Sequence, residues 1–301
     1  MNSRRNREKY LSILYGACLI VFTVFVLLKT FVLPEAGDVE VEMADIYETE
    51  STEQEAVITA DSYTDENIQI TLKTERINET DVYFVDIQLT DIQYLKTAFA
   101  KDTYGRNINE LTSAMAERHE AIVAINGDFY GFRDYGYVIR NGVLYRDNFG
   151  EGIEQVFVVY DDGSCDSVLA GAQTAEELVE AGVVQAISFG PALVEDGIVT
   201  VAESDPYNTA TIAGRNPRTA IGMISPLHYV FVVVDGRTSV SAGYTFYELG
   251  NVMADYGCVE AYNLDGGGSS TLYFNGEIIN MPTNGTTVGE REVSDIVYIG
   301  Y

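Results

Sequence analysis

Residues 259–276 read VEAYNLDGGGSSTLYFNG, two apolar runs joined by a turn of three glycines. The first run ends at Asn263 and Asp265, and the second closes on Asn275-Gly276. Consecutive glycines lose much backbone freedom on folding, so they are expected where the backbone approaches a ligand closely or where successive N–H groups face an anion. We therefore expect Asp265 to take part in acid/base chemistry or to bind a sugar hydroxyl. The alternative is a tight turn whose polar side chains bind only the local backbone.

The composition restricts the classes of partner. The chain has 301 residues, 47% of them hydrophobic, which is enough for a large core. Its 46 acidic and 18 basic residues give a formal net charge of −28. Nucleic acids and anionic membrane surfaces bind basic patches, so neither is an expected partner of the body of the protein.

The N-terminus resembles a targeting element. Residues 1–9 contain four basic side chains, and residues 10–33 are apolar except for Lys29 and a few small or polar side chains. A run of this length can span a bilayer, and the basic residues before it place the N-terminus in the cytoplasm. We predict an uncleaved signal anchor at 10–33, with the remaining chain outside the plasma membrane. A cleaved signal peptide is the alternative.

A change of composition follows the apolar run. Residues 34–67 contain many Asp and Glu and no Lys or Arg. Such like-charged segments with weak periodicity are typical of disordered spacers, so we predict an acidic, disordered stem. The folded domain is predicted at 68–301.

The periodicity within 68–301 predicts many strands and about three helices. Helices are expected at 109–120, 174–181 and 245–256, the last two with a Thr-x-x-Glu capping box. Tight hairpins are expected at Asn141-Gly142 and Asn275-Gly276. The fully apolar strand 229–234 is expected at the centre of a sheet. Together these elements predict a single mixed α+β domain with a multi-stranded, largely antiparallel sheet.

Three apolar strands end in the same chemistry, Asn or Asp next to Gly. Strand ends on one rim of a sheet commonly form binding sites, although each turn alone has a purely structural explanation. The candidates at these ends are Asn126, Asp128, Asp235, Arg237, Asn263, Asp265, Gly266, Gly267, Gly268, Ser269 and Ser270.

Arginine is scarce in this acidic chain, so its positions are informative. Arg215, Arg218 and Arg237 lie in polar segments flanked by Gly or Pro. A guanidinium binds phosphate through two parallel hydrogen bonds, and the glycine amides are predicted to bind the same group. Paired carboxylates, Asp128 or Asp265 with Asp235 or Glu248, are then candidates for general acid, base or nucleophile at a sugar carbon. The alternative role of Glu248 is the capping box alone.

Cysteine and histidine give little indication of a site. Cys165 and Cys258 lie in the predicted extracellular body, where a disulfide is chemically allowed, but their spacing leaves the pairing open. The chain has two histidines, His119 and His228, which we expect to be surface or hydrogen-bonded core residues. A histidine-based metal site or catalytic triad is therefore not expected.

Six ordered blocks resemble the phosphodiester glycosidase family: AINGDFY (124–130), GPALV (190–194), NPRTAIG (216–222), VDGR (234–237), GYTFYEL (243–249) and NLDGGGSST (263–271). The resemblance covers about 68–301. It implies hydrolysis of the bond between a sugar's anomeric carbon and a phosphate oxygen. Arg218 and the 266–268 backbone are the expected phosphate ligands, and Asp128, Asp265 and Glu248 the expected acid, base or nucleophile, with Asp235 orienting Arg237.

Two other functions remain open at this point. One is a non-catalytic envelope protein that binds glycan or organises exopolysaccharide through the same pocket. The other is a phosphodiesterase that cuts the other phosphate bond through a divalent cation, Ca²⁺ or Mg²⁺, held by Asp128 and Asp265. For the leading function we expect a phosphodiester-linked glycan of the cell envelope or extracellular space as substrate.

Overall fold

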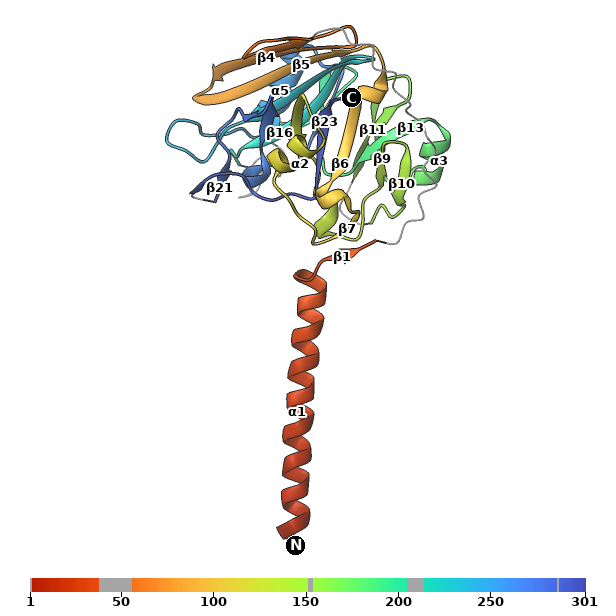
Figure 1. The fold of residues 1–301 in the computed structure, drawn as a ribbon, viewed down its shortest axis with the longest axis vertical. Coiled ribbons are helices and arrows are strands. Elements are labelled where there is room, and N and C mark those ends of the chain that lie inside the picture. Colours follow the sequence, from red (N-terminus) through yellow and green to blue (C-terminus); the bar gives the residue numbers. More distant parts are fainter. Residues whose placement is uncertain (1, 38–55, 151–153, 205–213, 286) are drawn as a thin grey trace.

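The computed structural model describes residues 2–37, 56–150, 154–204, 214–285 and 287–301 (Figure 1). The long helix α1 (Asn2–Phe31) projects from one end of the folded domain. Its segment Ile13–Phe31 has a mean hydropathy of 2.2 and is long and apolar enough to cross a membrane. Length and composition are consistent with both a signal anchor and a membrane span at this position.

The largest sheet has nine strands. The apolar strand β17 (His228–Val234) occupies its middle position, as predicted for a run that is buried on both faces. Every strand pair of the sheet is antiparallel. In spatial order the strands are β15 (Ile198–Val199), β14 (Ala192–Glu195), β18 (Glu260–Asn263), β16 (Arg218–Ser225), β17, β5 (Thr80–Leu89), β4 (Ile68–Ile77), β3 (Ser62–Thr64) and β2 (Val57–Ile58).

Two five-stranded antiparallel sheets complete the body of the domain. One has the order β20 (Glu277–Ile278), β19 (Leu272–Phe274), β8 (Val123–Asn126), β23 (Asp295–Ile299) and β6 (Leu95–Phe99). The other has the order β10 (Val143–Arg146), β9 (Val138–Arg140), β13 (Val183–Ile187), β11 (Gln155–Tyr160) and β12 (Cys165–Leu169). Two short pairs are β1 (Glu35–Ala36) with β7 (Gly105–Arg106) and β21 (Thr283–Asn284) with β22 (Thr287–Val288).

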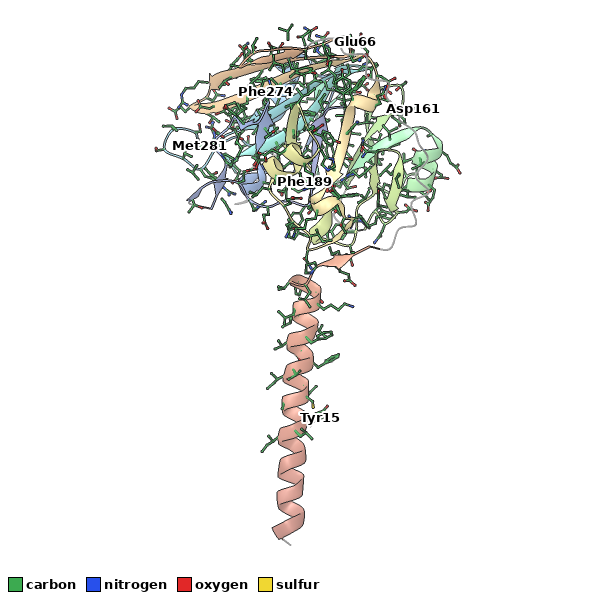
Figure 2. All side chains as sticks on the ribbon, viewed as in Figure 1. Tyr15, Glu66, Asp161, Phe189, Phe274 and Met281 are labelled. Atoms are coloured by element: carbon green, nitrogen blue, oxygen red, sulfur yellow. The ribbon has the colours of Figure 1, made fainter. Side chains whose placement is uncertain are left out.

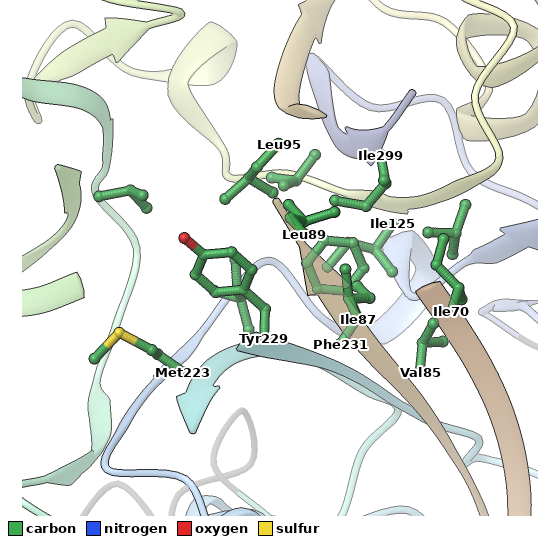
Figure 3. Packing of buried hydrophobic residues seen from close by; sticks show 14 of the residues in the cluster. Ile70, Val85, Ile87, Leu89, Leu95, Ile125, Met223, Tyr229, Phe231 and Ile299 are labelled. Carbon is green, nitrogen blue, oxygen red and sulfur yellow. The ribbon is translucent and has the colours of Figure 1, made fainter. Parts of the chain in front are cut away.

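The main core lies where the three sheets meet. Ile87 and Phe231 come from the nine-stranded sheet, and Ile125 and Ile299 from the β8 sheet, all in one buried cluster (Figure 3). Phe157 of β11 joins the same cluster from the third sheet. The predicted mixed, largely antiparallel α+β class is therefore confirmed, with the strands divided among several sheets.

Within the described ranges, three shorter α-helices and four 3₁₀ turns accompany the sheets. The α-helices are α2 (Thr112–Arg118), α3 (Ala175–Glu180) and α5 (Phe246–Tyr256). Both predicted capping boxes are present, at Thr174 and at Thr245. Gly257 ends α5 with φ of 105°, a left-handed conformation that glycine adopts most readily. Four 3₁₀ turns are η1 (Ile92–Tyr94), η2 (Ala100–Asp102), η3 (Tyr130–Phe132) and η4 (Gly267–Ser269).

The predicted disordered stem at 34–67 is wrong for its described residues. The strands β2 and β3 extend the nine-stranded sheet, and Tyr63 is buried in the main core. The Asp65 carboxylate lies near Tyr63, and hydrogen bonds stabilise its negative charge. It accepts them from the Tyr63 hydroxyl and from the amides of Asn67 and Ile68. Residues 38–55 of the predicted stem lie outside the described residues.

The two cysteines of the domain are buried, and its two histidines each contact an aspartate. Cys165 and Cys258 are both buried and unpaired, and burial raises the pKa of the Cys258 thiol to about 12. His119 lies 2.8 Å from an oxygen of Asp102. His228 lies 3.0 Å from an oxygen of Asp86. Both histidines are partly exposed and hydrogen-bonded, in agreement with the expectation of surface or hydrogen-bonded residues.

Candidate active site

The ends of three strands converge through the side chain of Asn126. The amide Nδ2 of Asn126 donates to the carbonyl of Asp265 across 2.7 Å, and its Oδ1 accepts from the Thr219 hydroxyl across 2.8 Å. The amide N–H of Thr271 lies 3.3 Å from the same Oδ1. Asn126 is fully buried, so its side chain joins β8 to the ends of β16 and β18. The predicted substrate-binding role is replaced by a structural role beneath the site.

A cavity of about 550 Å³ opens at these strand ends. Three arginines reach it, together with Asp265, three glycines and three phenylalanines. Its lining residues are Phe129, Phe189, Asn216, Arg218, Arg237, Phe246, Asp265, Gly266, Gly267, Gly268 and Arg291. The volume lies in the usual range for small-molecule sites.

Arg218 begins β16 and is held firmly in the cavity wall. Its Nε donates to the carbonyl of Tyr244 across 2.9 Å, and its guanidinium lies 4.0 Å from the ring centre of Phe246. Burial, and then the neighbouring Arg237, lower the pKa of Arg218 to about 10. A buried guanidinium (Arg218) close to an exposed one (Arg237) favours binding of an anion between or beside them.

Arg237 has an unusual backbone at the same wall. Its φ of 61° is left-handed, a conformation that costs about 1 kcal/mol for a residue other than glycine. Its Nε and Nη2 atoms donate to Oδ1 of Asn216 at 3.1 and 3.0 Å. Strained residues of this kind are concentrated at functional sites.

Asp235 does not orient Arg237, contrary to the sequence-based expectation. Its carboxylate instead accepts from Asn280, from the amide of Met281 and from the Tyr83 hydroxyl, at 3.0–3.1 Å. Burial raises the pKa of Asp235, and these hydrogen bonds oppose the rise. Asp235 does not line the cavity, and it holds the segment after β20 against β17 and β5.

The middle glycine of the three, Gly267, has a packing role in the turn. The amide of Gly267 donates to the Pro217 carbonyl across 2.9 Å, and the amides of Ser269 and Ser270 donate within η4. The Gly267 amide is therefore not free for the predicted phosphate contact, whereas phosphate binding by the amides of Gly266 and Gly268 stays a prediction. A Cβ on Gly267 would lie 2.9 Å from Nη2 of Arg237, and its φ is 62°. Glycine at 267 thus lets the Arg237 guanidinium lie against the turn.

Asp265 lies at the end of this turn with its carboxylate held from two sides. Its Oδ2 accepts from the Ser269 hydroxyl across 2.5 Å and from Nη2 of Arg291 across 3.0 Å. Burial raises the pKa of Asp265, whereas the Ser269 hydrogen bond and the Arg291 charge act in the opposite direction. The net effect raises the pKa, and a buried carboxyl whose pKa is shifted in this way is a candidate for proton transfer or for attack on an electrophilic carbon.

A smaller cavity of about 170 Å³ adjoins the first and shares Phe129, Asp265 and Arg291 with it. Asp128 lines this second space. The Asp128 carboxylate accepts from the amide of Tyr130 across 2.8 Å and from the amide of Ser188 across 3.1 Å. The structure therefore brings Asp128 and Asp265 to one cavity, whereas the partners predicted for them as paired carboxylates, Asp235 and Glu248, line neither cavity.

A buried arginine supports Asp128 from below. Arg140 donates from Nε and Nη2 to Oδ2 of Asp295 at 3.1 and 2.8 Å, and its Nη2 lies 3.4 Å from Oδ2 of Asp128. Burial raises the pKa of Asp295, and Arg140 opposes the rise. Arg140 and Asp295 were not identified from the sequence, because each lies within an ordinary apolar strand.

Three other predicted site residues lie outside both cavity linings. Glu248 caps α5 through the amide of Thr245 and pairs with Arg215. Asn263 donates to the Gly190 carbonyl across 2.8 Å, and Ser270 is fully buried beside Asn280. Only the first of these side chains is charged, and its capping role accounts for its position.

Arg291 is the main residue that the sequence analysis missed. It lies in a polar loop without recognisable periodicity, yet it contacts Asp265 and Ser269 and lines both cavities. The scarcity of arginine in this acidic chain is the signal that could have identified it. Phe129, Phe189 and Phe246 were also missed, because single aromatic residues are expected in any core.

The structure also bears on the predicted cation. Among the described residues, no group of three or more His, Cys, Asp and Glu side chains is arranged to hold a metal ion. The oxygens of Asp128 are occupied by two amides and face Arg140. The divalent cation remains an untested prediction.

The chain is similar to several curated proteins. The SPbeta prophage-derived uncharacterized protein YomE of Bacillus subtilis is 34% identical over 204 residues, covering 66% of this chain and 31% of that protein. The N-acetylglucosamine-1-phosphodiester alpha-N-acetylglucosaminidase of Mus musculus is 26% identical over 177 residues, covering 54% of this chain and 33% of that protein. The chain thus spans about a third of the length of these relatives.

Solved structures share the fold. The catalytic domain of zebrafish N-acetylglucosamine-1-phosphodiester alpha-N-acetylglucosaminidase, auto-inhibited by its pro-peptide, has a TM-score of 0.62 at 21% identity and covers 78% of this chain and 83% of that one. A hypothetical protein from Synechocystis has a TM-score of 0.52 at 16% identity, covering 78% and 62%. The phosphodiester glycosidase family model matches residues 119–300, which contain all six sequence blocks. The chain belongs to the phosphodiester glycosidase family.

Proposed function

We propose that this protein hydrolyses the bond between a sugar's anomeric carbon and the phosphate oxygen of a sugar-phosphodiester. The observation that carries the proposal is the convergence of Arg218, Arg237 and Arg291 on one cavity beside the buried carboxyl of Asp265. In a chain of net charge −28, such a cluster of cations is suited to a specific anionic ligand. Family membership supports a hydrolase of this kind.

The arginines match the charge change of the reaction. A phosphodiester carries one negative charge, and the phosphomonoester that leaves carries more. Guanidinium groups that are already in place stabilise charge as it develops on the leaving phosphate, which lowers the barrier without reorganisation. Arg218 is fixed by Tyr244 and Phe246, and Arg237 by Asn216, so both are positioned before substrate binds.

The aromatic residues provide a surface for the sugar. Phe129, Phe189 and Phe246 line the same cavity as the arginines. The C–H faces of a pyranose ring pack against aromatic rings, while its hydroxyls need polar partners such as Asn216. This division gives the cavity a phosphate side and a sugar side.

The carboxyls act at the anomeric carbon. Water adds its oxygen to this carbon, the bond to the phosphate oxygen breaks, and the electron pair leaves with the phosphate. Asp265 is proposed to attack the carbon or to take a proton from the water, in the ionised form that Arg291 and Ser269 favour. Asp128, which lines the adjoining cavity, is the second carboxyl.

The helix α1 supports a proposal for the location. We propose that α1 is an uncleaved anchor, with residues 1–9 in the cytoplasm and the domain outside the plasma membrane. The substrates available to such a protein are phosphodiester-linked glycans of the cell envelope or of the extracellular space.

The test uses the full chain in detergent with a synthetic N-acetylglucosamine 1-(methyl phosphate) in heavy-oxygen water. Release of heavy-oxygen-labelled sugar and unlabelled methyl phosphate supports the glycosidase. Sugar 1-phosphate with methanol would instead indicate the phosphodiesterase, and a chelator arm would then test the Ca²⁺ or Mg²⁺ requirement. Binding without turnover across a panel of sugars would favour the non-catalytic glycan-binding protein and would rule out the proposed reaction.

A further inference from the structure

The end of the membrane-spanning candidate is fastened to the folded domain. Only residues 32–34 separate α1 from β1, and β1 pairs with β7 (Figure 1). The Leu33 carbonyl accepts from Asn107 across 3.2 Å, and the amide of Gly37 donates to the Tyr104 carbonyl across 2.9 Å. We call residues 33–37 the strap.

The strap packs closely against residues 104–106. A Cβ on Gly37 would lie 2.5 Å from the ring of Tyr104. A Cβ on Gly105 would lie 2.2 Å from the Glu35 carbonyl. Both positions need the space that glycine leaves, because real Cβ atoms do not approach other atoms so closely. The contact is therefore a specific docking of two backbones.

The segment that contacts the strap, residues 104–107, adjoins the candidate active site. Asn107, which follows β7 directly, donates its amide to the Gly131 carbonyl across 2.9 Å. Gly131 belongs to η3, and the residue before η3 is Phe129, which lines both cavities. Phe132, at the end of η3, is 38% exposed and stacks on Phe129 with ring centres 4.5 Å apart.

The wider arrangement agrees with this proximity. Phe189, another lining residue of the larger cavity, lies in the half of the domain nearer to α1, whereas Glu66 lies at the far end (Figure 2). The strand β1 lies between α1 and the end of the domain that contains β7. Residues 32–34 would span at most about 10 Å even if fully extended, so the docked strap holds this end of the domain close to the bilayer surface.

We propose that the strap directs the active site toward the membrane, and that the substrates are sugar-phosphodiesters whose phosphate is esterified to a membrane lipid. A soluble substrate would be served equally well by a freely swinging domain. The strongly acidic body would also not adsorb to headgroups by itself, so a fixed orientation has to come from the strap. The stacked Phe129 and Phe132 present an apolar rim to the lipid portion. The inference rests on the proposed function and on α1 spanning the bilayer.

The test compares two substrates of one full-length protein reconstituted in phosphatidylcholine vesicles. One is N-acetylglucosamine 1-phosphate esterified to a long alkyl chain embedded in the same vesicles, and the other is the soluble methyl ester. Gly37→Val detaches the strap, and Ala36→Val is the matched control because the Ala36 side chain is exposed. We expect Gly37→Val to lower the rate on the embedded substrate about tenfold and to leave the soluble rate unchanged.

A second variant does not depend on disturbing the strap. A flexible Gly/Ser spacer of about twenty residues inserted after Val32 keeps β1 docked but moves the domain away from the bilayer. The same selective loss is expected. Unchanged rates on both substrates, or equal losses on both, would overturn the inference. If the unmodified chain cleaves neither substrate, both the proposed function and the inference fail. If it cleaves both substrates and neither variant changes either rate, the proposed function stands and only the inference is overturned.

Discussion

Arg291 and Asp265 form an ion pair of 3.0 Å at the wall that the two cavities share. Ser269 closes the arrangement, because its hydroxyl donates to the same carboxylate oxygen and accepts from Nε of Arg291 across 3.1 Å. The Ser269 hydroxyl thus connects the Asp265 carboxyl, which is proposed to act on the sugar, with the Arg291 guanidinium, which is proposed to bind the phosphate. Substrate phosphate would compete with Asp265 for Arg291, which couples binding to release of the carboxylate.

Asp265→Asn tests the carboxyl directly. The substitution keeps the shape of the side chain and removes its charge and its ability to accept a proton. We expect turnover to fall at least about a hundredfold, while the melting temperature stays close to that of the unmodified protein because burial already disfavours the charge. Initial rates and thermal unfolding measure the two effects. An unchanged rate would show that Asp265 is not at the reaction centre.

Arg291→Met tests the phosphate contact. Hydrogen bonds to charged groups are worth about 1.5–3 kcal/mol, so we expect kcat/KM to fall about tenfold to a hundredfold. The control is Arg76→Met, which removes an exposed arginine paired with Asp81 across 2.7 Å. The control should retain full activity. Equal effects of the two substitutions would point to the overall charge rather than to the cavity.

Local signals in the sequence predicted much of the fold. Asn141-Gly142 makes the expected tight hairpin, with positive φ at both residues. The capping boxes at Thr174 and Thr245 begin α3 and α5 as expected. These features depend on neighbouring residues, so a single sequence contains the information. The division into three sheets depends on distant pairings, for example β8 with β23, and no local pattern specifies it.

The site was predicted in composition and only partly in its roles. Asn126, Asp128 and Asp265 follow strands in the same way, yet Asn126 is a buried link between sheets and the two carboxyls line a cavity. A side chain at a strand end can bind substrate or backbone, and the choice depends on partners far along the chain. Asp235 illustrates this, because its partners Asn280 and Met281 come from a loop that follows a different sheet.

Glu260 predicts a pH dependence of stability outside the site. Burial, chiefly, raises the pKa of Glu260 to about 7, and the amide of Asp196 opposes the rise. The folded state then favours the neutral form, so the stabilisation present below the unfolded pKa is lost as pH rises through 7. Glu260→Gln should therefore gain about 1–2 kcal/mol over the unmodified protein between pH 5 and pH 8. Denaturant unfolding at several pH values measures this difference.

The control for Glu260 is Glu277→Gln on β20, which removes one exposed negative charge. Its unfolding free energy should stay close to that of the unmodified protein. If the unfolding free energies of Glu260→Gln and Glu277→Gln differ from that of the unmodified protein in the same way at every pH, the effect comes from net charge and not from burial of Glu260.

The buried Arg140 gives the last prediction. Arg140→Met removes the cation between Asp295 and Asp128 and leaves the buried Asp295 carboxylate without its ion-pair partner, a change that costs about 3–5 kcal/mol of unfolding free energy. Asp128 keeps the amides of Tyr130 and Ser188 and the Arg133 guanidinium 3.7 Å away. Burial already raises the pKa of Asp295, and loss of Arg140 would raise this pKa further. Stability of the variant should then recover as pH falls and Asp295 becomes neutral.

The double variant Arg140→Met/Asp295→Asn should recover part of the loss at neutral pH, because one buried charge is gone. If the single variant is destabilised equally at all pH values, packing of the arginine stem rather than its charge stabilises the region beneath Asp128.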